Sequence, residues 1–124
     1  MPETILLVDD ETSVRRLVRR ILQMNGYTVL EASGGMDAIQ ICQRHEGPIH
    51  LLVTDVLMPG MNGQDLAERM TALRPHTRVL YMSGCIDSAL ITLSDRKTEI
   101  AFIQKPFAPD ALARKVREIL DTSR

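Results

Sequence analysis

The chain has 124 residues, of which 44% are hydrophobic, and this matches the size and composition of one globular domain with a hydrophobic core. Its formal net charge of -1 gives no reason to expect general nucleic-acid binding, and no apolar run approaches the roughly 20 residues of a membrane helix. The amino terminus lacks the basic start of a signal peptide, so we expect one cytoplasmic domain over residues 1–124.

Apolar runs alternate with segments of helical periodicity along the first part of the chain. A strand is expected at residues 4–9, and apolar residues at helical spacing over 14–22 predict a helix that stops at Asn25–Gly26. A short strand follows at 28–32. After a glycine turn, a second helix is expected to end near Arg44.

The second half of the chain continues this alternation. The continuous apolar run at 50–55 indicates a strand buried on both faces, and the loop over 55–63 is rich in turn residues. A helix over 66–73 and a strand at 78–83 follow. The segment 86–97 predicts a helix only weakly, because its apolar residues show modest periodicity.

The last two elements are a strand at 101–104 and a helix that begins at Pro109, a residue that suits the first helical position. Five strands that alternate with five helices predict an α/β fold, with a doubly wound parallel sheet and helices on both faces.

Five polar residues stand at the ends of four predicted strands. Asp9 and Asp10 follow the first strand, Asp55 the third, Ser83 the fourth and Lys105 the fifth. The carboxyl ends of parallel strands meet at one edge of the sheet, so we expect these residues to share a cleft. Three carboxylates so near to one another repel each other. A hard divalent cation with oxygen ligands would offset their charge.

These residues and their neighbours resemble the receiver domain of two-component response regulators, and the resemblance covers essentially the whole chain. It rests on Asp9–Asp10, on DVLMPGMNG around Asp55, on Ser83–Gly84 and on Lys105–Pro106, each after its own strand. The resemblance implies a flavodoxin-like sheet with strand order 2-1-3-4-5. The segments VLYMSG and FIQKPFAPDALARKVREIL also resemble receivers at the end of hybrid sensor kinases, so a stand-alone regulator and an excised module both remain open.

In this family an aspartate carboxylate takes a phosphoryl group from phosphohistidine on a histidine kinase or histidine phosphotransfer protein. The resemblance assigns that role to Asp55. It makes Asp10 a direct Mg2+ ligand, Asp9 a second acidic partner that often acts through water, and the backbone carbonyl of Leu57 a further ligand. The alternatives are an aspartate that caps a turn, and an acidic pair that decorates a helix amino terminus.

The resemblance gives the remaining polar residues supporting roles. Lys105 would pair with Asp55 when the site is empty and with a phosphoryl oxygen afterwards, and its bond to Pro106 would be cis. Ser83 and the N–H of Gly84 would donate hydrogen bonds to the phosphoryl group. A solvated lysine and a strand-end hydroxyl tied to local backbone are the alternatives.

Phe102 matches the aromatic switch residue of the family, three residues before the lysine. On phosphorylation Ser83 would move toward the phosphoryl group, and the ring would turn into the space left behind. This would alter the face made by the fourth helix, the fifth strand and the fifth helix. A plain core phenylalanine is the alternative. Leu57 is apolar and would not position a hydrolytic water, so we expect slow loss of the phosphoryl group.

Other residues carry weaker signals. Four arginines in the first predicted helix favour a solvated face, with docking of the phosphodonor as the alternative: Arg15, Arg16, Arg19 and Arg20. Cys42 and Cys85 form no CxxC pair, and we favour two small hydrophobic residues over a disulfide. The three histidines lack metal-ligand spacing.

Two other function classes compete with a phosphoacceptor. A Mg2+-dependent phosphatase or phosphotransferase on a related fold would turn over external substrate, but a second aspartate commonly follows its nucleophile by two residues, where this chain has Leu57. A degenerate receiver would only bind a partner, and the complete polar set argues against it. We therefore expect a signalling domain and no turnover enzyme. The sequence leaves open the partner kinase, the output, the stimulus and the oligomeric state, including a dimer formed on phosphorylation.

Overall fold

The computed structural model describes residues 2–84 and 101–121, and the structural statements below concern these residues. Five parallel strands form one sheet in the order β2-β1-β3-β4-β5, which confirms the order implied by the family resemblance. The strands are β1 (Thr4–Val8), β2 (Thr28–Ala32), β3 (Leu51–Asp55), β4 (Arg78–Ser83) and β5 (Ala101–Gln104).

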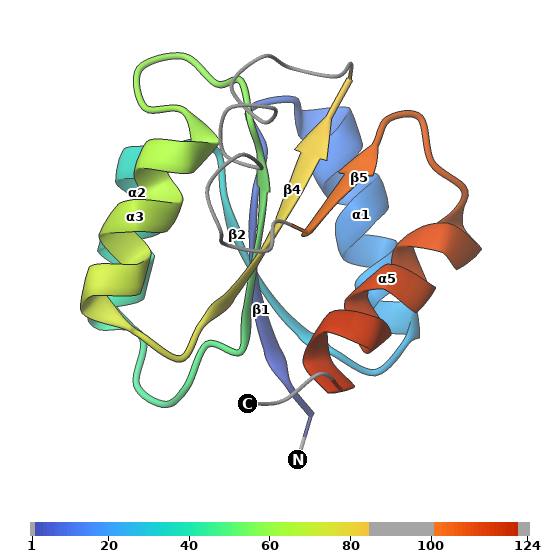
Figure 1. Ribbon diagram of the computed structural model, residues 1–124, viewed down its shortest axis with the longest axis horizontal. Coiled ribbons are helices and arrows are strands. Elements are labelled where there is room, and N and C mark those ends of the chain that lie inside the picture. Colours follow the sequence, from blue (N-terminus) through green and yellow to red (C-terminus); the bar gives the residue numbers. More distant parts are fainter. Residues whose placement is uncertain (1, 85–100, 122–124) are drawn as a thin grey trace.

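Helices cover both faces of the sheet (Figure 1). They are α1 (Thr12–Met24), α2 (Gly35–Arg44), α3 (Gly63–Leu73) and α5 (Pro109–Asp121). We expected five helices, and the described part of the chain has four. The expected helix over 86–97 lies outside the described residues, as does Cys85.

Side chains that alternate along the strands build two separate hydrophobic cores. Ile5 and Leu7 of β1 belong to the core beneath α1 and α5, whereas Leu6 and Val8 belong to the core beneath α2 and α3. All residues of β3 are buried, which agrees with the continuous apolar run read from the sequence. The sheet is thus held from both sides, and its central strands have a fixed position.

Helix α3 begins immediately after the loop that follows β3. Asn62 caps it, because the Asp65 backbone N–H donates to the Asn62 side-chain oxygen at 2.8 Å. The Gly63 N–H also donates to the Val56 carbonyl at 2.8 Å, which ties the start of the helix to the end of β3. Among the described helices, none has the length and apolar character needed to cross a membrane.

Candidate functional site

The predicted site residues gather at the carboxyl edge of the sheet. Asp9 and Asp10 directly follow β1, Asp55 is the last residue of β3, and Ser83 is the last residue of β4. Lys105 follows β5, where its backbone N–H donates to the Ser83 carbonyl at 2.7 Å and extends the pairing of the two strands. Strand topology therefore brings together residues that lie far apart in the sequence.

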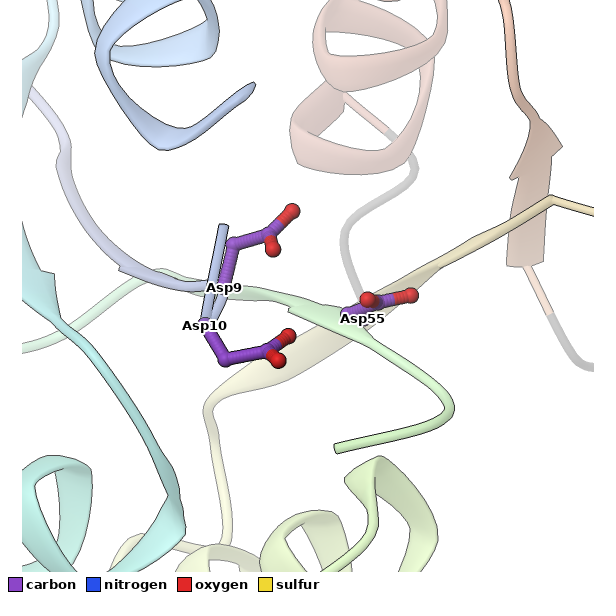
Figure 2. A group of neighbouring side chains, drawn as sticks. All are labelled: Asp9, Asp10 and Asp55. Carbon is purple, nitrogen blue, oxygen red and sulfur yellow. The ribbon is translucent and has the colours of Figure 1, made fainter. Parts of the chain in front are cut away.

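Three carboxylates form a compact acidic cluster. Asp9, Asp10 and Asp55 each offer one oxygen, and these oxygens all lie within 4.8 Å of one another. Figure 2 shows Asp9 and Asp10 projecting from consecutive positions, with Asp55 on the neighbouring strand. Asp9 is fully buried and Asp55 is 9% exposed, whereas Asp10 is open to solvent.

Lys105 places its ammonium group between two of these carboxylates. Its Nζ lies 3.3 Å from Asp9 Oδ2 and 3.4 Å from Asp55 Oδ2. The sequence led us to expect Asp55 as the partner, and the structure adds Asp9. The Lys105–Pro106 peptide bond is cis, as the family resemblance implied. The alternative of a solvated surface lysine is wrong.

The pKa values of Asp55 and Lys105 reflect burial first and the charges of their neighbours second. Burial raises the pKa of Asp55, Lys105 opposes this rise, and the charges of Asp9 and Asp10 add to it. Burial alone would lower the pKa of Lys105, but its two carboxylate partners outweigh that effect and raise it. The site therefore holds an excess of negative charge in a partly buried position, which favours an additional cation.

The cluster suits Mg2+ by its donor chemistry, since Mg2+ is held in proteins by one or two carboxylates and keeps several waters. Among the described residues, the Asp10 carboxylate makes no hydrogen bond or ion pair, so its oxygens are available to a ligand. The Leu57 side chain is 65% exposed in the loop two residues beyond Asp55, and the role of its carbonyl stays a prediction.

Both the backbone and the side chain of Asp9 have hydrogen-bond or ion-pair partners. Its backbone N–H donates to the Ala32 carbonyl at 3.2 Å, and its Oδ1 accepts from the Glu11 N–H at 2.9 Å, just before α1. Asp9 Oδ2 faces Lys105. The Asp9 carboxylate thus belongs to the cluster and also satisfies a backbone donor beside the helix start, as the alternative interpretation expected, while its role toward a metal stays a prediction.

Ser83 is buried at the end of β4, one position beyond Met82, which pairs in register with Asp55. Gly84 is exposed, and a Cβ atom added there would meet no atom within 4 Å. The hydrogen bonds that both residues would donate to a phosphoryl group stay predictions.

Phe102 is 43% exposed on β5, in register with Tyr81 of β4. The alternative of a plain core phenylalanine is therefore wrong. The neighbours of Phe102 along β5, Ala101 and Ile103, pack instead against the core beneath α1 and α5. The alternation of β5 places the Phe102 ring on the opposite side.

The arginines of α1 divide into two pairs, which corrects the expectation of one solvated face. Arg15 and Arg19 both form ion pairs with Glu31 of β2, and Arg15 Nη1 also donates to the Asp9 carbonyl at 2.7 Å. Arg16 and Arg20 are exposed, and no ion pair involves them within the described residues.

Two contributors to the site escaped the sequence analysis. A Cβ at Gly63 would overlap the Asp55 carbonyl oxygen, so only glycine allows α3 to approach β3 this closely. A glycine directly after a capping asparagine was the available signal. For the contact between Arg15 and the Asp9 carbonyl the sequence carries no such signal, because it depends on how α1 docks on the sheet.

Comparison with known proteins agrees with this geometry. A family model for the response regulator receiver domain matches residues 5–117. The chain is 36% identical to the sensor kinase CckA of Brucella abortus over 95% of its own length but only 12% of that protein. It is 33% identical to the response regulator receiver protein CpdR of the same organism, covering 94% of this chain and 95% of CpdR.

Solved structures agree in fold. The crystal structure of the receiver domain from the hybrid histidine kinase CckA has a TM-score of 0.79 and 34% identity, covering 94% of this chain and 98% of that domain. A CheY-like receiver domain protein from Methanospirillum hungatei JF-1 has a TM-score of 0.87 and 28% identity, covering 98% and 95%. With the acidic cluster and the paired lysine at the expected sheet edge, the chain belongs to the response regulator receiver domain family.

Proposed function

We propose that residues 1–124 form one cytoplasmic receiver domain that accepts a phosphoryl group on Asp55 from a phosphohistidine, with Mg2+ bound beside it. The donor would be a histidine kinase or a histidine phosphotransfer protein. One observation carries this proposal, namely the cluster of Asp9, Asp10 and Asp55 within 4.8 Å, with the Lys105 ammonium group 3.4 Å from Asp55. A sensor kinase and a sporulation initiation phosphotransferase are among its relatives.

The transfer itself needs only one nucleophile on this chain. An oxygen of the Asp55 carboxylate attacks the phosphorus, the bond between phosphorus and the donor imidazole nitrogen breaks, and an acyl phosphate forms. The imidazole leaves with the electron pair of that bond and takes a proton from solvent. Asp55 keeps an exposed fraction of 9%, through which a donor would reach it.

The surrounding residues offset the negative charge that gathers on the phosphoryl oxygens. Lys105 already lies at hydrogen-bonding or ion-pairing distance from both Asp9 and Asp55 and can turn to a phosphoryl oxygen. Ser83 and the Gly84 N–H would donate hydrogen bonds. Asp9, Asp10, Asp55 and the Leu57 carbonyl would hold Mg2+, directly or through water. When bound, Mg2+ supplies charge stabilisation for the transferring phosphoryl group.

Incubation with Mg2+ and acetyl phosphate tests the proposal, with intact mass as the measurement. We expect one phosphoryl group per chain, lost in Asp55→Asn and retained in Asp65→Asn, a matched change at an exposed aspartate of α3. Labelling that survives in Asp55→Asn would contradict the assignment of the acceptor.

The same assay separates the competing function classes. Steady hydrolysis of many equivalents of acetyl phosphate would indicate a phosphatase or phosphotransferase. No labelling and no amide shift with the phosphoryl mimic beryllofluoride would indicate a domain that only binds a partner. Stoichiometric labelling without continued turnover is the result expected of a signalling phosphoacceptor.

We further propose that phosphorylation alters the surface around β5. Phe102 is half exposed there, and β5 pairs with β4, whose last residue is the buried Ser83. Movement of Ser83 toward the phosphoryl group would change the space available to the ring. We expect beryllofluoride to shift the Phe102 ring resonances in NMR spectra, and to leave them unchanged in Ser83→Ala. Equal ring shifts in both proteins would contradict this coupling.

The exposed pair Arg16 and Arg20 on α1 is the better candidate for docking of the donor, since Arg15 and Arg19 are engaged with Glu31. Reversing both charges should slow phosphotransfer from a phosphohistidine donor protein while labelling by acetyl phosphate stays intact. Equal slowing with both donors would argue against docking at this face.

The lifetime of the acyl phosphate is a further proposal. Leu57 is apolar and 65% exposed beside the acceptor, so it offers no polar group to hold an attacking water. We expect the labelled protein to lose its phosphoryl group slowly, over minutes rather than seconds, and to lose it faster in Leu57→Asn. A wild-type lifetime of seconds would oppose the idea.

A further inference from the structure

We propose that Arg15 is a positioning residue for the acidic pair, and that Glu31 holds Arg15 in the orientation this requires. The inference rests on the proposed binding of Mg2+ at the site. It deepens that proposal by naming how the exposed ligand, Asp10, is kept in place.

Arg15 joins three elements through its guanidinium group. Its Nη1 donates to the Asp9 carbonyl at 2.7 Å, and its Nε lies 3.3 Å from Glu31 Oε1. Arg19 of α1 contacts the other oxygen of the same carboxylate. The Arg15 and Glu31 side chains are 16% and 26% exposed, so this arrangement is partly shielded from water. The rigid fork of an arginine suits two acceptors held at a fixed angle.

The Asp9 carbonyl belongs to the peptide unit that joins Asp9 to Asp10. That unit is planar, so a fixed carbonyl direction also fixes the positions of the Cα atoms of Asp9 and Asp10 within the plane. The remaining polar groups of Asp9 already have partners, namely the Ala32 carbonyl, the Glu11 N–H and Lys105. Asp9 is therefore held without Arg15.

Asp10 differs from Asp9 in this respect. It is exposed, and within residues 2–84 and 101–121 its side chain has no hydrogen-bond or ion-pair partner that would orient it. Its direction depends in part on the peptide plane before it, and Arg15 donates the only side-chain hydrogen bond to that plane among the described residues. Loss of Arg15 should consequently loosen Asp10 far more than Asp9.

Arg15 could affect Mg2+ binding through its positive charge or by orienting the acidic pair, and these two effects make opposite predictions for Arg15→Ala. If only its positive charge mattered, Arg15→Ala would make the cluster more negative and Mg2+ would bind more tightly. If Arg15 orients the acidic pair, the same change would weaken Mg2+ binding. Groups that orient metal ligands from outside the coordination sphere are worth about 10- to 100-fold in metal affinity. We therefore expect the dissociation constant to rise by about tenfold.

The test is a titration of the intact chain with Mg2+ alone, followed by backbone amide shifts in NMR spectra. Arg69→Ala is the matched control, because it removes the same charge from an exposed arginine of α3 that has no ion pair in the described residues. We expect weaker Mg2+ binding in Arg15→Ala, with the largest change of shifts at Asp10, and binding within about twofold of wild type in Arg69→Ala. Equal or tighter binding in Arg15→Ala overturns the inference.

A second variant keeps the question answerable if Arg15→Ala does not fold. Arg15→Lys retains the charge but loses the fork that reaches the Asp9 carbonyl and Glu31 together, and we expect its Mg2+ affinity to fall as well. Wild-type affinity in Arg15→Lys would overturn the inference. Absence of Mg2+ binding in the wild-type chain would instead contradict the proposed function itself, and with it this role for Arg15.

Discussion

At the scale of single residues, Asp55, the nucleophile that we propose, carries a charge that its surroundings destabilise. It is largely buried, it shares the ammonium group of Lys105 with Asp9, and Asp10 adds a third carboxylate to the cluster. Burial raises its pKa, and Asp9 and Asp10 add to the rise against the opposing effect of Lys105. The ionised side chain is thus less favourable in the folded protein than in the unfolded chain.

The first prediction concerns stability. Asp55→Asn should raise the free energy of unfolding at neutral pH in Mg2+-free buffer, because it removes a buried charge that its surroundings disfavour. Urea denaturation measures this change. Asp65→Asn provides the contrast, since it removes a charge from the first turn of α3 and should cost about 0.3–1 kcal/mol. A loss of stability in Asp55→Asn would contradict the electrostatic description of the site.

The second prediction concerns pH. Burial, with a smaller contribution from Glu68, raises the pKa of Tyr81 above its ordinary value of 10.0. The neutral phenol is therefore favoured in the folded state. Its contribution to stability is complete below pH 10 and is lost as the pH rises through the raised folded pKa.

Absorbance of tyrosinate in folded and denatured protein measures the shift of Tyr81. Tyr27 is the other tyrosine, and burial raises its pKa too, although Arg117 opposes the rise. Tyr81→Phe assigns the two transitions, because it removes one of them. Titration of Tyr81 at the same pH in folded and denatured protein would contradict its burial.

At the level of elements, hydrogen bonds tie the connection from β3 to α3 to the end of β3 that carries Asp55. The Gly63 N–H donates to the Val56 carbonyl at 2.8 Å, and Val56 donates in turn to the Met82 carbonyl at 3.0 Å. The helix start, the end of β3 and the end of β4 are thus linked in series. Any atom inserted between α3 and β3 would move the end of β3 that carries Asp55.

The third prediction tests this close approach. Gly63→Ala should destabilise the fold by roughly 1–3 kcal/mol, because its Cβ overlaps the Asp55 carbonyl and backbone must move. It should also slow labelling by acetyl phosphate, measured by intact mass. Gly34→Ala is the control, since a Cβ there meets no atom within 4 Å. Equal behaviour of the two variants would exclude a special role for Gly63.

At the level of the whole molecule, the two ends of the sheet are differently built. The acidic cluster lies at the carboxyl ends of β1 and β3, whereas Arg117 of α5 contacts residues that precede the amino ends of β1 and β2. Its guanidinium contacts Glu3 at 2.8 Å and Asp121 at 2.9 Å, and lies over the Tyr27 ring. Figure 1 shows the end of α5 near the amino terminus.

The fourth prediction is that a change at the amino ends of the strands leaves the site at their carboxyl ends unaffected. Arg117→Met should cost about 1 kcal/mol or less in unfolding free energy, because exposed ion pairs contribute little in water. The rate of labelling by acetyl phosphate should not change. In contrast, Lys105→Met should strongly reduce labelling. A large loss of labelling in Arg117→Met would mean that the two ends are coupled.

The sequence by itself determined the strand and helix alternation over most of the chain and the residues that end each strand. Mostly apolar runs of four residues followed by Asp55, Ser83 or Lys105 identified the sheet edge, because parallel strands must align their carboxyl ends. The boundary of the first strand differed, because we expected residues 4–9, whereas β1 ends at Val8 and leaves Asp9 outside the strand. Local pattern suffices for these features, since each depends on neighbours in the chain.

Only the tertiary structure decided which partners these residues have. Lys105 divides its contacts between Asp9 and Asp55, Arg15 reaches the Asp9 carbonyl, and Gly63 lies against Asp55. Phe102 faces outward although its strand reads as core. These are contacts between elements, and their geometry follows from helix docking and sheet register, in which a shift of one residue would reverse the face of each side chain. No local pattern in a single chain encodes that placement.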